Sequence, residues 1–232
     1  MIHGLFDILS LMAAVGVAKW FRDRYGLTRP AGIEDQNQQR YYLVALLMGL
    51  ALGSLIFGTW NLWLSGANGL AKSVLGGIFG AVVAAELFKR FNGISCSTGL
   101  YFVPGLVVLI ALGRIGCFLS GLDDHTHGIV TELPWGVDFG DGVLRHPVQL
   151  YESLSMLLFL VFLLVDYPRR PRIWRQQGFY WFVLFYALQR FVWEILKPYP
   201  AVLFGLNLFQ WLCLVLLAYA LWMLKPGVTD DE

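Results

Sequence analysis

Two arginines, Arg114 and Arg190, lie inside long apolar stretches of the sequence. A charged side chain at the centre of a membrane helix costs about 2.5–3.5 kcal/mol on insertion scales, so such residues are functional candidates. The guanidinium group is always charged and planar, and it binds phosphate oxygens through two parallel hydrogen bonds. Two such groups at one depth predict a binding site for a phosphodiester head group.

Carboxylates accompany these arginines. Tyr186, Arg190 and Glu194 follow at intervals of four residues, so they share one face of a helix. Glu152 lies in another apolar stretch, and it and Glu194 are able to orient the guanidinium groups or to transfer protons. The alternative is an intrahelical pair of Arg190 and Glu194 that only neutralises itself. A second buried cation at Arg114 also needs a partner, which favours a shared head-group site over a self-contained ion pair.

A metal site is the weaker interpretation of the polar run 123–127. Its members are Asp123, Asp124, His125 and His127. A polar loop explains them better, because the sequence has no second, distant cluster of ligands. We therefore expect no metal and no cofactor.

Two other residues have a structural explanation that outweighs a functional one. Cys117 is a candidate nucleophile one turn after Arg114, but a small packing residue is the favoured interpretation. Glu86 is expected to have a structural role near the inner end of its helix. In that helix a row of small residues predicts close helix packing, namely Gly76, Gly80 and Ala84.

The composition places these residues in a membrane. Of the 232 residues, 57% are apolar and 14% are charged, whereas soluble domains have about 45–50% and about 25%. A water-soluble domain and a disordered chain are both excluded. With 17 basic and 16 acidic residues, the chain is not a general nucleic-acid binder. Its three cysteines do not form a disulfide framework.

Seven apolar stretches approach the roughly 20 residues that a transmembrane helix needs. They are Leu5–Val17, Tyr41–Leu64, Leu70–Phe88, Gly99–Leu119, Val148–Val165, Gly178–Leu196 and Leu203–Leu224. The first is short, but it lacks the basic start and cleavage site of a signal peptide. We expect an all-α integral membrane protein with seven transmembrane helices that forms one domain over residues 1–232.

The distribution of basic residues predicts the direction of the helices. Lysines and arginines gather after the first, third and fifth stretches, and loops of this kind stay in the cytoplasm. Only Lys72, Arg145 and Lys197 fall in loops on the other side. The N-terminus is therefore predicted outside and the C-terminus in the cytoplasm. Residues 120–147 then form an outer segment that we expect to be an ordered lid.

The predicted direction also gives a depth for the site. Arg114 and Arg190 lie five and six residues before the outer ends of their helices, roughly 8–9 Å below those ends. Glu152 lies about one turn inside its own helix. The charges thus converge on one level, and the site is predicted to face the outer leaflet.

Three short motifs occur in order along the chain. Residues 113–121 read GRIGCFLSG, residues 145–152 read RHPVQLYE, and Tyr186, Arg190 and Glu194 follow on a late helix. In order and rough spacing they resemble the signatures GRxGNFxNG, RHPSQLYE and Y-x3-R-x3-E of the prolipoprotein diacylglyceryl transferases. The resemblance covers roughly residues 76–198.

This resemblance implies an enzyme of the bacterial inner membrane. Such enzymes move the diacylglyceryl group of phosphatidylglycerol to the cysteine thiol of a prolipoprotein and release glycerol 1-phosphate. The implied catalytic residues are Arg114, Arg190, Tyr186, His146 and Glu152. The implied substrate-binding residues are Arg114, Arg145, Gln149, Tyr151, Glu194, Gly113 and Gly116.

The resemblance also implies a role for each group. The two arginines would hold and neutralise the departing phosphate, and the carboxylates would fix the arginines. Tyr186 and Tyr151 would donate hydrogen bonds, and His146 would accept a proton near the outer interface. The implied partners are phosphatidylglycerol, or another anionic glycerophospholipid, and a prolipoprotein signal peptide.

Several positions depart from the family pattern, and four of them leave the acceptor of the diacylglyceryl group open. Leu75 stands where the family has a histidine before two glycines, and leucine cannot take a proton from a thiol. Cys117 and Ser120 replace two asparagines, and Leu122 replaces a glutamate. The acceptor is therefore a prolipoprotein thiol or a different group. The alternative is a non-catalytic lipid-binding or assembly protein. A transporter is less favoured, because the charges lie at one depth and inverted repeats are absent.

Overall fold

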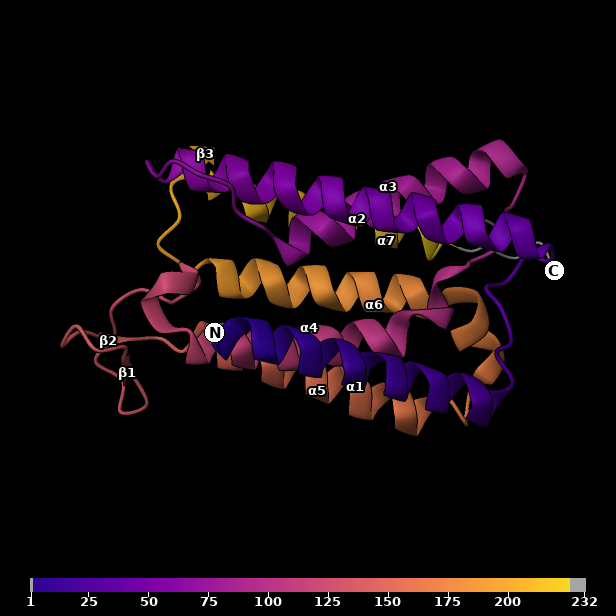
Figure 1. Cartoon of the computed structure of the whole chain (residues 1–232), viewed down its shortest axis with the longest axis horizontal. Coiled ribbons are helices and arrows are strands. Elements are labelled where there is room, and N and C mark those ends of the chain that lie inside the picture. The colour runs from indigo at the N-terminus through magenta and orange to yellow at the C-terminus, as the bar shows by residue number, and fades with distance from the viewer. Residues whose placement is uncertain (1, 226–232) are drawn as a thin grey trace. The chain divides into compact units, whose positions relative to one another are not determined.

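A computed structural model describes the backbone of residues 2–225 and the side chains of residues 4–225. These residues are mostly helical, which confirms the all-α class (Figure 1). The α-helices are α1 (Ile2–Tyr25), α2 (Gln36–Leu64), α3 (Val74–Asn92), α4 (Val103–Leu119), α5 (Val148–Asp166), α6 (Pro171–Glu194) and α7 (Leu208–Met223). Each expected apolar stretch therefore overlaps one α-helix.

Short elements connect some of the helices. Two 3-10 turns, η1 (Gly99–Tyr101) and η2 (Gly121–Asp124), lie before and after α4. Strands β1 (Val137–Asp138) and β2 (Leu144–Arg145) pair antiparallel between α4 and α5. Strands β3 (Ala201–Leu203) and β4 (Leu206–Asn207) pair antiparallel between α6 and α7.

Among the described residues, three helical segments are long and apolar enough to cross a bilayer: Gly4–Tyr25, Gln36–Leu64 and Val148–Asp166. Helices α4 and α7 are apolar but shorter. Large apolar side chains on α2 and α5 are exposed, among them Leu47 and Leu158. Lipid-facing helices have such surfaces, whereas soluble monomers rarely expose large apolar patches. The number of spans and their direction stay predictions.

Several helix boundaries differ from the predicted ones, because a helix does not stop where its apolar run stops. Helix α1 continues to Tyr25 instead of Val17, and α6 begins at Pro171 instead of Gly178. Both extensions include basic residues, and Pro171 occupies a first-turn position that suits proline.

The predicted start of the last helix at Leu203 was wrong. Residues 201–207 form the β3–β4 hairpin, whose turn contains Gly205 at φ +74°. The helix begins after Asn207, whose side chain accepts a hydrogen bond from the backbone N–H of Gln210. The Gln210 side chain in turn accepts a hydrogen bond from the Asn207 N–H. This capping box fixes the start of α7.

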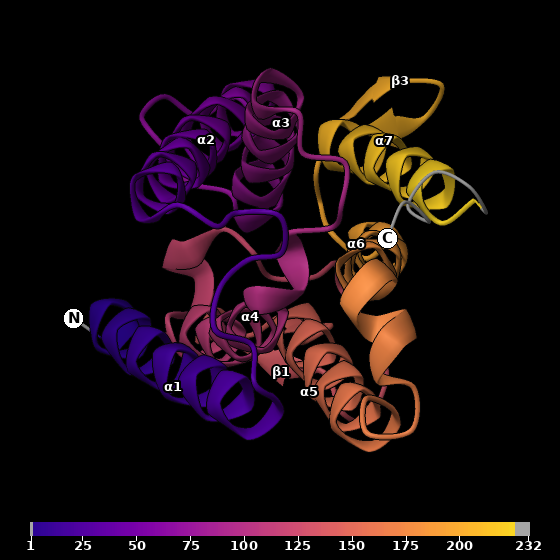
Figure 2. The same ribbon diagram turned by 90° about the vertical axis from the view of Figure 1, so that its right-hand side faces the viewer.

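The described chain divides into two compact units, and α6 contributes residues to both. The first unit comprises the residues up to Leu27, Tyr101–Pro171 and Leu188–Pro198. In it α4 packs against both α1 and α5 (Figures 1 and 2). Gly105 permits the contact with α1, because a Cβ there would lie 3.1 Å from the Ala18 Cβ.

The second unit comprises Thr28–Leu100, Arg172–Ala187 and the residues from Tyr199 onward. Helices α2 and α3 lie side by side in it (Figure 2). A Cβ at Gly80 would collide with the Gly49 carbonyl, and a Cβ at Gly76 would lie 2.5 Å from the Gly53 carbonyl oxygen. The predicted small-residue row therefore forms a close helix contact.

Glu86 connects two helices of the second unit. Its carboxylate accepts hydrogen bonds from Lys89 Nζ at 3.1 Å and from the Tyr219 hydroxyl at 2.7 Å. Tyr219 lies on α7, so the contact joins α3 to α7. This arrangement favours the structural role expected for Glu86.

Candidate active site

Glu152 lies at the centre of a buried group of charges in the first unit, which we call the charge cluster. Arg114 Nε lies 2.7 Å from Glu152 Oε2, and Lys197 Nζ lies 2.6 Å from Glu152 Oε1. Arg190 Nη1 donates to the same Oε1. The side chains of Glu152 and Lys197 are fully buried. The cluster thus joins α4, α5 and the end of α6.

Glu194 completes the charge cluster. Arg190 Nη2 lies 2.5 Å from Glu194 Oε1, and Lys197 Nζ lies 3.5 Å from the same atom. The intrahelical pair of Arg190 and Glu194 therefore exists, but Arg190 also reaches Glu152 on α5. Three cations and two carboxylates give these five side chains a net charge of +1.

The end of α6 positions two members of the charge cluster. Arg190 and Glu194 are one helical turn apart, and α6 ends at Glu194. Tight backbone hydrogen bonds follow, including Lys197 N to Glu194 O at 3.2 Å, which bring Lys197 back over the last turn. The Ile129 N–H donates to the Leu196 carbonyl at 2.8 Å and fixes this turn to the outer segment.

Lys197 is the residue that sequence reasoning missed. It lies in the loop after α6, as expected, but its side chain is fully buried on Glu152, which was not predicted from the sequence. The signal was its spacing: Lys197 follows Glu194 by three residues and Arg190 by seven. That spacing continues the charged face of α6, although Pro198 ends the helical pattern.

Gln149 lies three residues before Glu152 on α5. Residues three apart share one helix face, and both side chains are fully buried. Neither the amide nitrogen nor the amide oxygen of Gln149 has a hydrogen-bond partner among the residues that the structure describes. Buried polar groups are normally paired.

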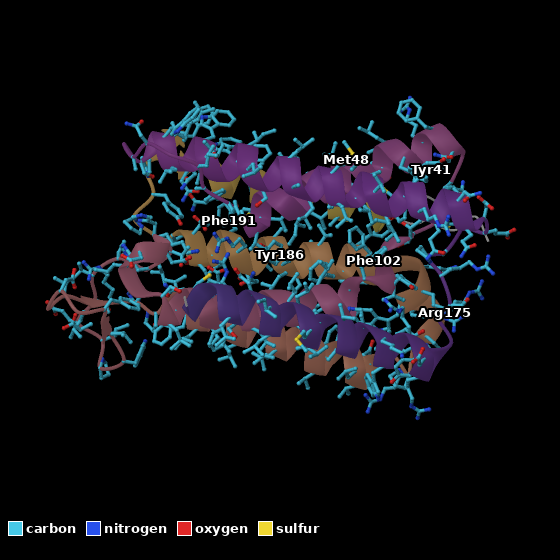
Figure 3. All side chains as sticks on the ribbon, in the orientation of Figure 1. Tyr41, Met48, Phe102, Arg175, Tyr186 and Phe191 are labelled. Carbon is cyan, nitrogen blue, oxygen red and sulfur yellow. The ribbon has the colours of Figure 1, made fainter. Side chains whose placement is uncertain are left out.

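Tyr186 lies on α6 (Figure 3). It precedes Arg190 by one turn, and its side chain is fully buried. Its ring stacks on Phe182, with centroids 6.0 Å apart and planes 22° apart. The predicted common face of Tyr186, Arg190 and Glu194 therefore lies on one continuous helix. Tyr186 belongs to the second unit and the other two to the first.

His146 and Tyr151 form a hydrogen-bonded group with Trp135. The Trp135 indole N–H donates to the Tyr151 hydroxyl at 2.8 Å, and that hydroxyl lies 3.4 Å from His146 Nδ1. The Tyr151 ring also contacts Trp193 of α6 at 5.2 Å between centroids. These contacts hold the outer segment against α5 and α6.

Arg145 is paired with Asp141 in the outer segment. Its two terminal nitrogens contact the two carboxylate oxygens at 2.7 Å each. This ion pair holds the pKa of Asp141 below its ordinary value, chiefly through the hydrogen bond from Arg145. The predicted substrate-binding role of Arg145 stays a prediction, because its guanidinium group is occupied by Asp141 in this structure.

The residues of the motif at positions 113–121 differ in their surroundings. A Cβ at Gly116 would lie 2.6 Å from the Phe6 Cβ of α1, so this glycine permits helix packing. Around Gly113, a Cβ would meet nothing within 4 Å in the described part of the chain. Arg114 Nη1 lies 4.0 Å from Cys117 Sγ. Cys117 thus lines the neighbourhood of the charge cluster.

The polar run of the outer segment makes local contacts. Thr126 donates to Asp124 at 2.6 Å, and His127 Nδ1 lies 3.2 Å from the Gly128 carbonyl. His125 has a left-handed backbone, with φ +53°. Within residues 2–225, no group of three or more His, Cys, Asp or Glu side chains is arranged to hold a metal ion.

Comparisons with known proteins agree with the motifs. The family model of the prolipoprotein diacylglyceryl transferases matches residues 1–225. A phosphatidylglycerol–prolipoprotein diacylglyceryl transferase of Nitratidesulfovibrio vulgaris is 33% identical, over 97% of this chain and 89% of that protein. The enzymes of the same name from Solidesulfovibrio magneticus and Aliarcobacter butzleri are 31% and 28% identical, over 99% and 93% of this chain and 91% and 82% of those proteins.

No solved structure matched the chain. The family match nevertheless spans nearly the whole sequence and includes every member of the charge cluster. This protein therefore belongs to the prolipoprotein diacylglyceryl transferase family and is a membrane enzyme of the diacylglyceryl transferase class.

Proposed function

We propose that this protein transfers the diacylglyceryl group of phosphatidylglycerol to the cysteine thiol of a prolipoprotein. The observation that carries the proposal is the charge cluster, a buried set of five side chains with a net charge of +1. A phosphodiester has a charge of −1, so it complements the cluster. The names of the relatives support the choice of lipid and acceptor.

The cluster suits the charge that develops in this reaction. The thiol sulfur forms a bond to the phosphate-bearing carbon of the diacylated glycerol. The bond between that carbon and the phosphate oxygen breaks. The thiol loses its proton, and glycerol 1-phosphate leaves with one more negative charge than the diester had. Arg114 and Arg190 lie within ion-pair distance of one carboxylate, so both guanidinium groups are held in place before the reaction.

Other residues support the arginines in this proposal. Glu152 and Glu194 orient the guanidinium groups, and Tyr186, one turn from Arg190, donates a hydrogen bond to the phosphate. His146, held by Tyr151 through a 3.4 Å contact, accepts a proton near the outer end of α5. Gly113 leaves space beside Arg114, because a Cβ there would meet no described atom within 4 Å.

A different acceptor is the second candidate function, and Leu75 favours it. This residue stands where the family motif has a histidine, and its side chain is fully buried and apolar. A leucine cannot activate a thiol. Under this alternative the same lipid is bound and cleaved, but the diacylglyceryl group passes to another nucleophile.

We further propose that the protein is a multi-pass protein of the bacterial inner membrane, with seven spans and the site in the outer leaflet. The long apolar helices and the bacterial origin of the relatives support this location. The outer segment, residues 120–147, acts as a lid. Its hydrogen bonds to Leu196 and Tyr151 lie close in sequence to the charge cluster.

An assay of the purified protein in phosphatidylglycerol vesicles with a prolipoprotein signal peptide tests the proposal. We expect the peptide to gain a diacylglyceryl thioether and glycerol 1-phosphate to be released. Arg114→Ala and Arg190→Ala should each lower the rate by about 100-fold or more, as loss of one charge-stabilising donor does. Arg172→Ala, at an exposed arginine in the first turn of α6, is the matched control.

Each other outcome has a defined meaning. Consumption of the lipid without modification of the peptide would support the alternative acceptor. Lipid binding without any consumption would mean that the chain has lost the family activity. Unchanged activity in both arginine variants would contradict the role of the charge cluster.

A further inference from the structure

Gln149 is a fully buried polar residue that the mechanism above does not use. Its amide offers two N–H donors and a carbonyl acceptor. Neither amide atom has a partner within the described residues. A buried donor or acceptor without a partner costs free energy, and native proteins contain few of them. An apolar side chain of similar volume would fill the same space without this cost.

The position of Gln149 on α5 relates it to the charge cluster. The buried side chains of α5 include Gln149, Glu152, Ser153, Met156 and Phe159. Their spacing of three and four residues defines one face of the helix. Gln149 is therefore on the face of α5 that carries Glu152, about one turn closer to the start of the helix.

The chemistry of the Gln149 amide limits which ligand group can form hydrogen bonds with both its nitrogen and its oxygen. A hydroxyl group both accepts from an N–H and donates to a carbonyl, so it satisfies both amide atoms. An ammonium group donates only, and a quaternary ammonium group does neither. A cationic head group is also disfavoured near a cluster with a net charge of +1. The complement is an uncharged, hydroxylated head group on an anionic phosphodiester.

We propose that Gln149 is the specificity-determining residue that binds a hydroxyl of the glycerol head group. This inference rests on the proposed function and deepens it. The charge cluster binds the phosphate. The Gln149 amide, one turn away, forms hydrogen bonds with a hydroxyl of the glycerol head group that leaves with the phosphate. Phosphatidylglycerol is thereby distinguished from zwitterionic phospholipids and from anionic phosphodiesters without head-group hydroxyls.

The test compares two lipids that differ only in head-group hydroxyls, phosphatidylglycerol and phosphatidylpropanol. Each is presented in vesicles together with the prolipoprotein signal peptide as acceptor, and release of the head-group phosphate ester is measured. The wild type should prefer phosphatidylglycerol by at least about tenfold in kcat/KM, because a site built for a hydroxyl rejects an analogue that lacks it. Gln149→Met keeps the approximate side-chain volume and should turn over the two lipids at similar rates.

Two controls separate recognition from folding. Gln177→Met, at a half-buried glutamine of the second unit, should keep the preference of the wild type. The midpoint of thermal unfolding of Gln149→Met should equal or exceed that of the wild type, since an unpaired amide has been removed. If Gln149 had a purely structural role, Gln149→Met would instead lower this midpoint and reduce the turnover of both lipids equally.

The outcomes also distinguish this inference from the proposed function. If the wild type releases no head group from either lipid, the proposed function fails. If the wild type cleaves both lipids equally well, or if Gln149→Met keeps the tenfold preference, the function stands and the role of Gln149 is wrong.

Discussion

Glu152 connects the buried charges of this enzyme, because a single carboxylate accepts contacts from Arg114, Arg190 and Lys197. Removing an ion from water costs several kcal/mol even after the protein relaxes, and close partners must offset that cost. The two carboxylates and three cations therefore depend on one another. Loss of a carboxylate raises the uncompensated positive charge of the cluster, and loss of a cation removes a close contact from a fully buried carboxylate.

Lys197 offers a test of this dependence. Lys197→Met removes the contact of 2.6 Å to Glu152 while leaving a side chain of similar length. We expect the free energy of unfolding to fall by about 1.5–3 kcal/mol, because Glu152 loses one charged hydrogen-bond donor but keeps its contacts with both arginines. Thermal unfolding in detergent micelles measures the change. Lys197→Arg keeps the charge and should recover most of the loss, whereas equal stability of Lys197→Met and wild type would show that the pair is not needed.

Part of the site was predictable at the residue scale because helical spacing relates residues within one helix. The pairing of Arg190 with Glu194 follows from this rule, and Arg114, Arg190 and Glu152 stood out as charges in apolar stretches. Lys197 was not predicted as a site residue. It lies just after an apolar stretch, so it was counted among the basic residues of a loop, and the sequence did not indicate that its side chain folds back onto Glu152. The pairing of Arg145 with Asp141 depends on the β1–β2 turn, which spacing did not reveal.

At the scale of elements, the order and type of the helices were predictable and their ends were not. Apolar runs indicate where a helix meets lipid, but α1 and α6 extend beyond them through polar residues. The end of α6 matters most, since the tight turn after Glu194 brings Lys197 to Glu152. The outer segment adds a further restraint through its hydrogen bond from Ile129 to Leu196.

The β1–β2 hairpin should respond to acid through Asp141. Its pKa lies below the ordinary value in the folded protein, because Arg145 binds the carboxylate. The stabilisation is therefore fully present above the ordinary aspartate pKa of about 3.9, and it is lost as the pH falls through the lower folded pKa. Hydrogen exchange of residues 137–145, corrected for its intrinsic pH dependence, should show constant protection near neutral pH and a decrease below about pH 4.

Asp141→Asn provides the control for this pH dependence. The variant lacks the carboxylate, so protection of the hairpin should already be low at neutral pH and should vary less with acidification. If the variant and the wild type lost protection over the same pH range to the same extent, another group would be responsible.

At the scale of the whole molecule, the composition predicted a membrane protein because charged residues are too few to cover a water-exposed surface. The structure explains where the apolar residues are. Large side chains such as Leu47 and Leu158 are exposed on long helices, where lipid is the favourable solvent. The bias of basic residues then predicts the direction of insertion, which depends on charge in the loops and not on any contact within the protein.

Under the proposed function, the predicted direction determines the leaflet from which the charge cluster would receive its lipid. Replacing Cys96, Cys117 and Cys213 gives a background without thiols, into which Glu132→Cys or Glu34→Cys is introduced. Both positions are exposed, the first in the outer segment and the second between α1 and α2. A membrane-impermeant maleimide should label Glu132→Cys in intact cells and Glu34→Cys only after permeabilisation, because the basic loop between α1 and α2 is predicted to stay in the cytoplasm. The opposite pattern would place the outer segment in the cytoplasm and the site in the inner leaflet.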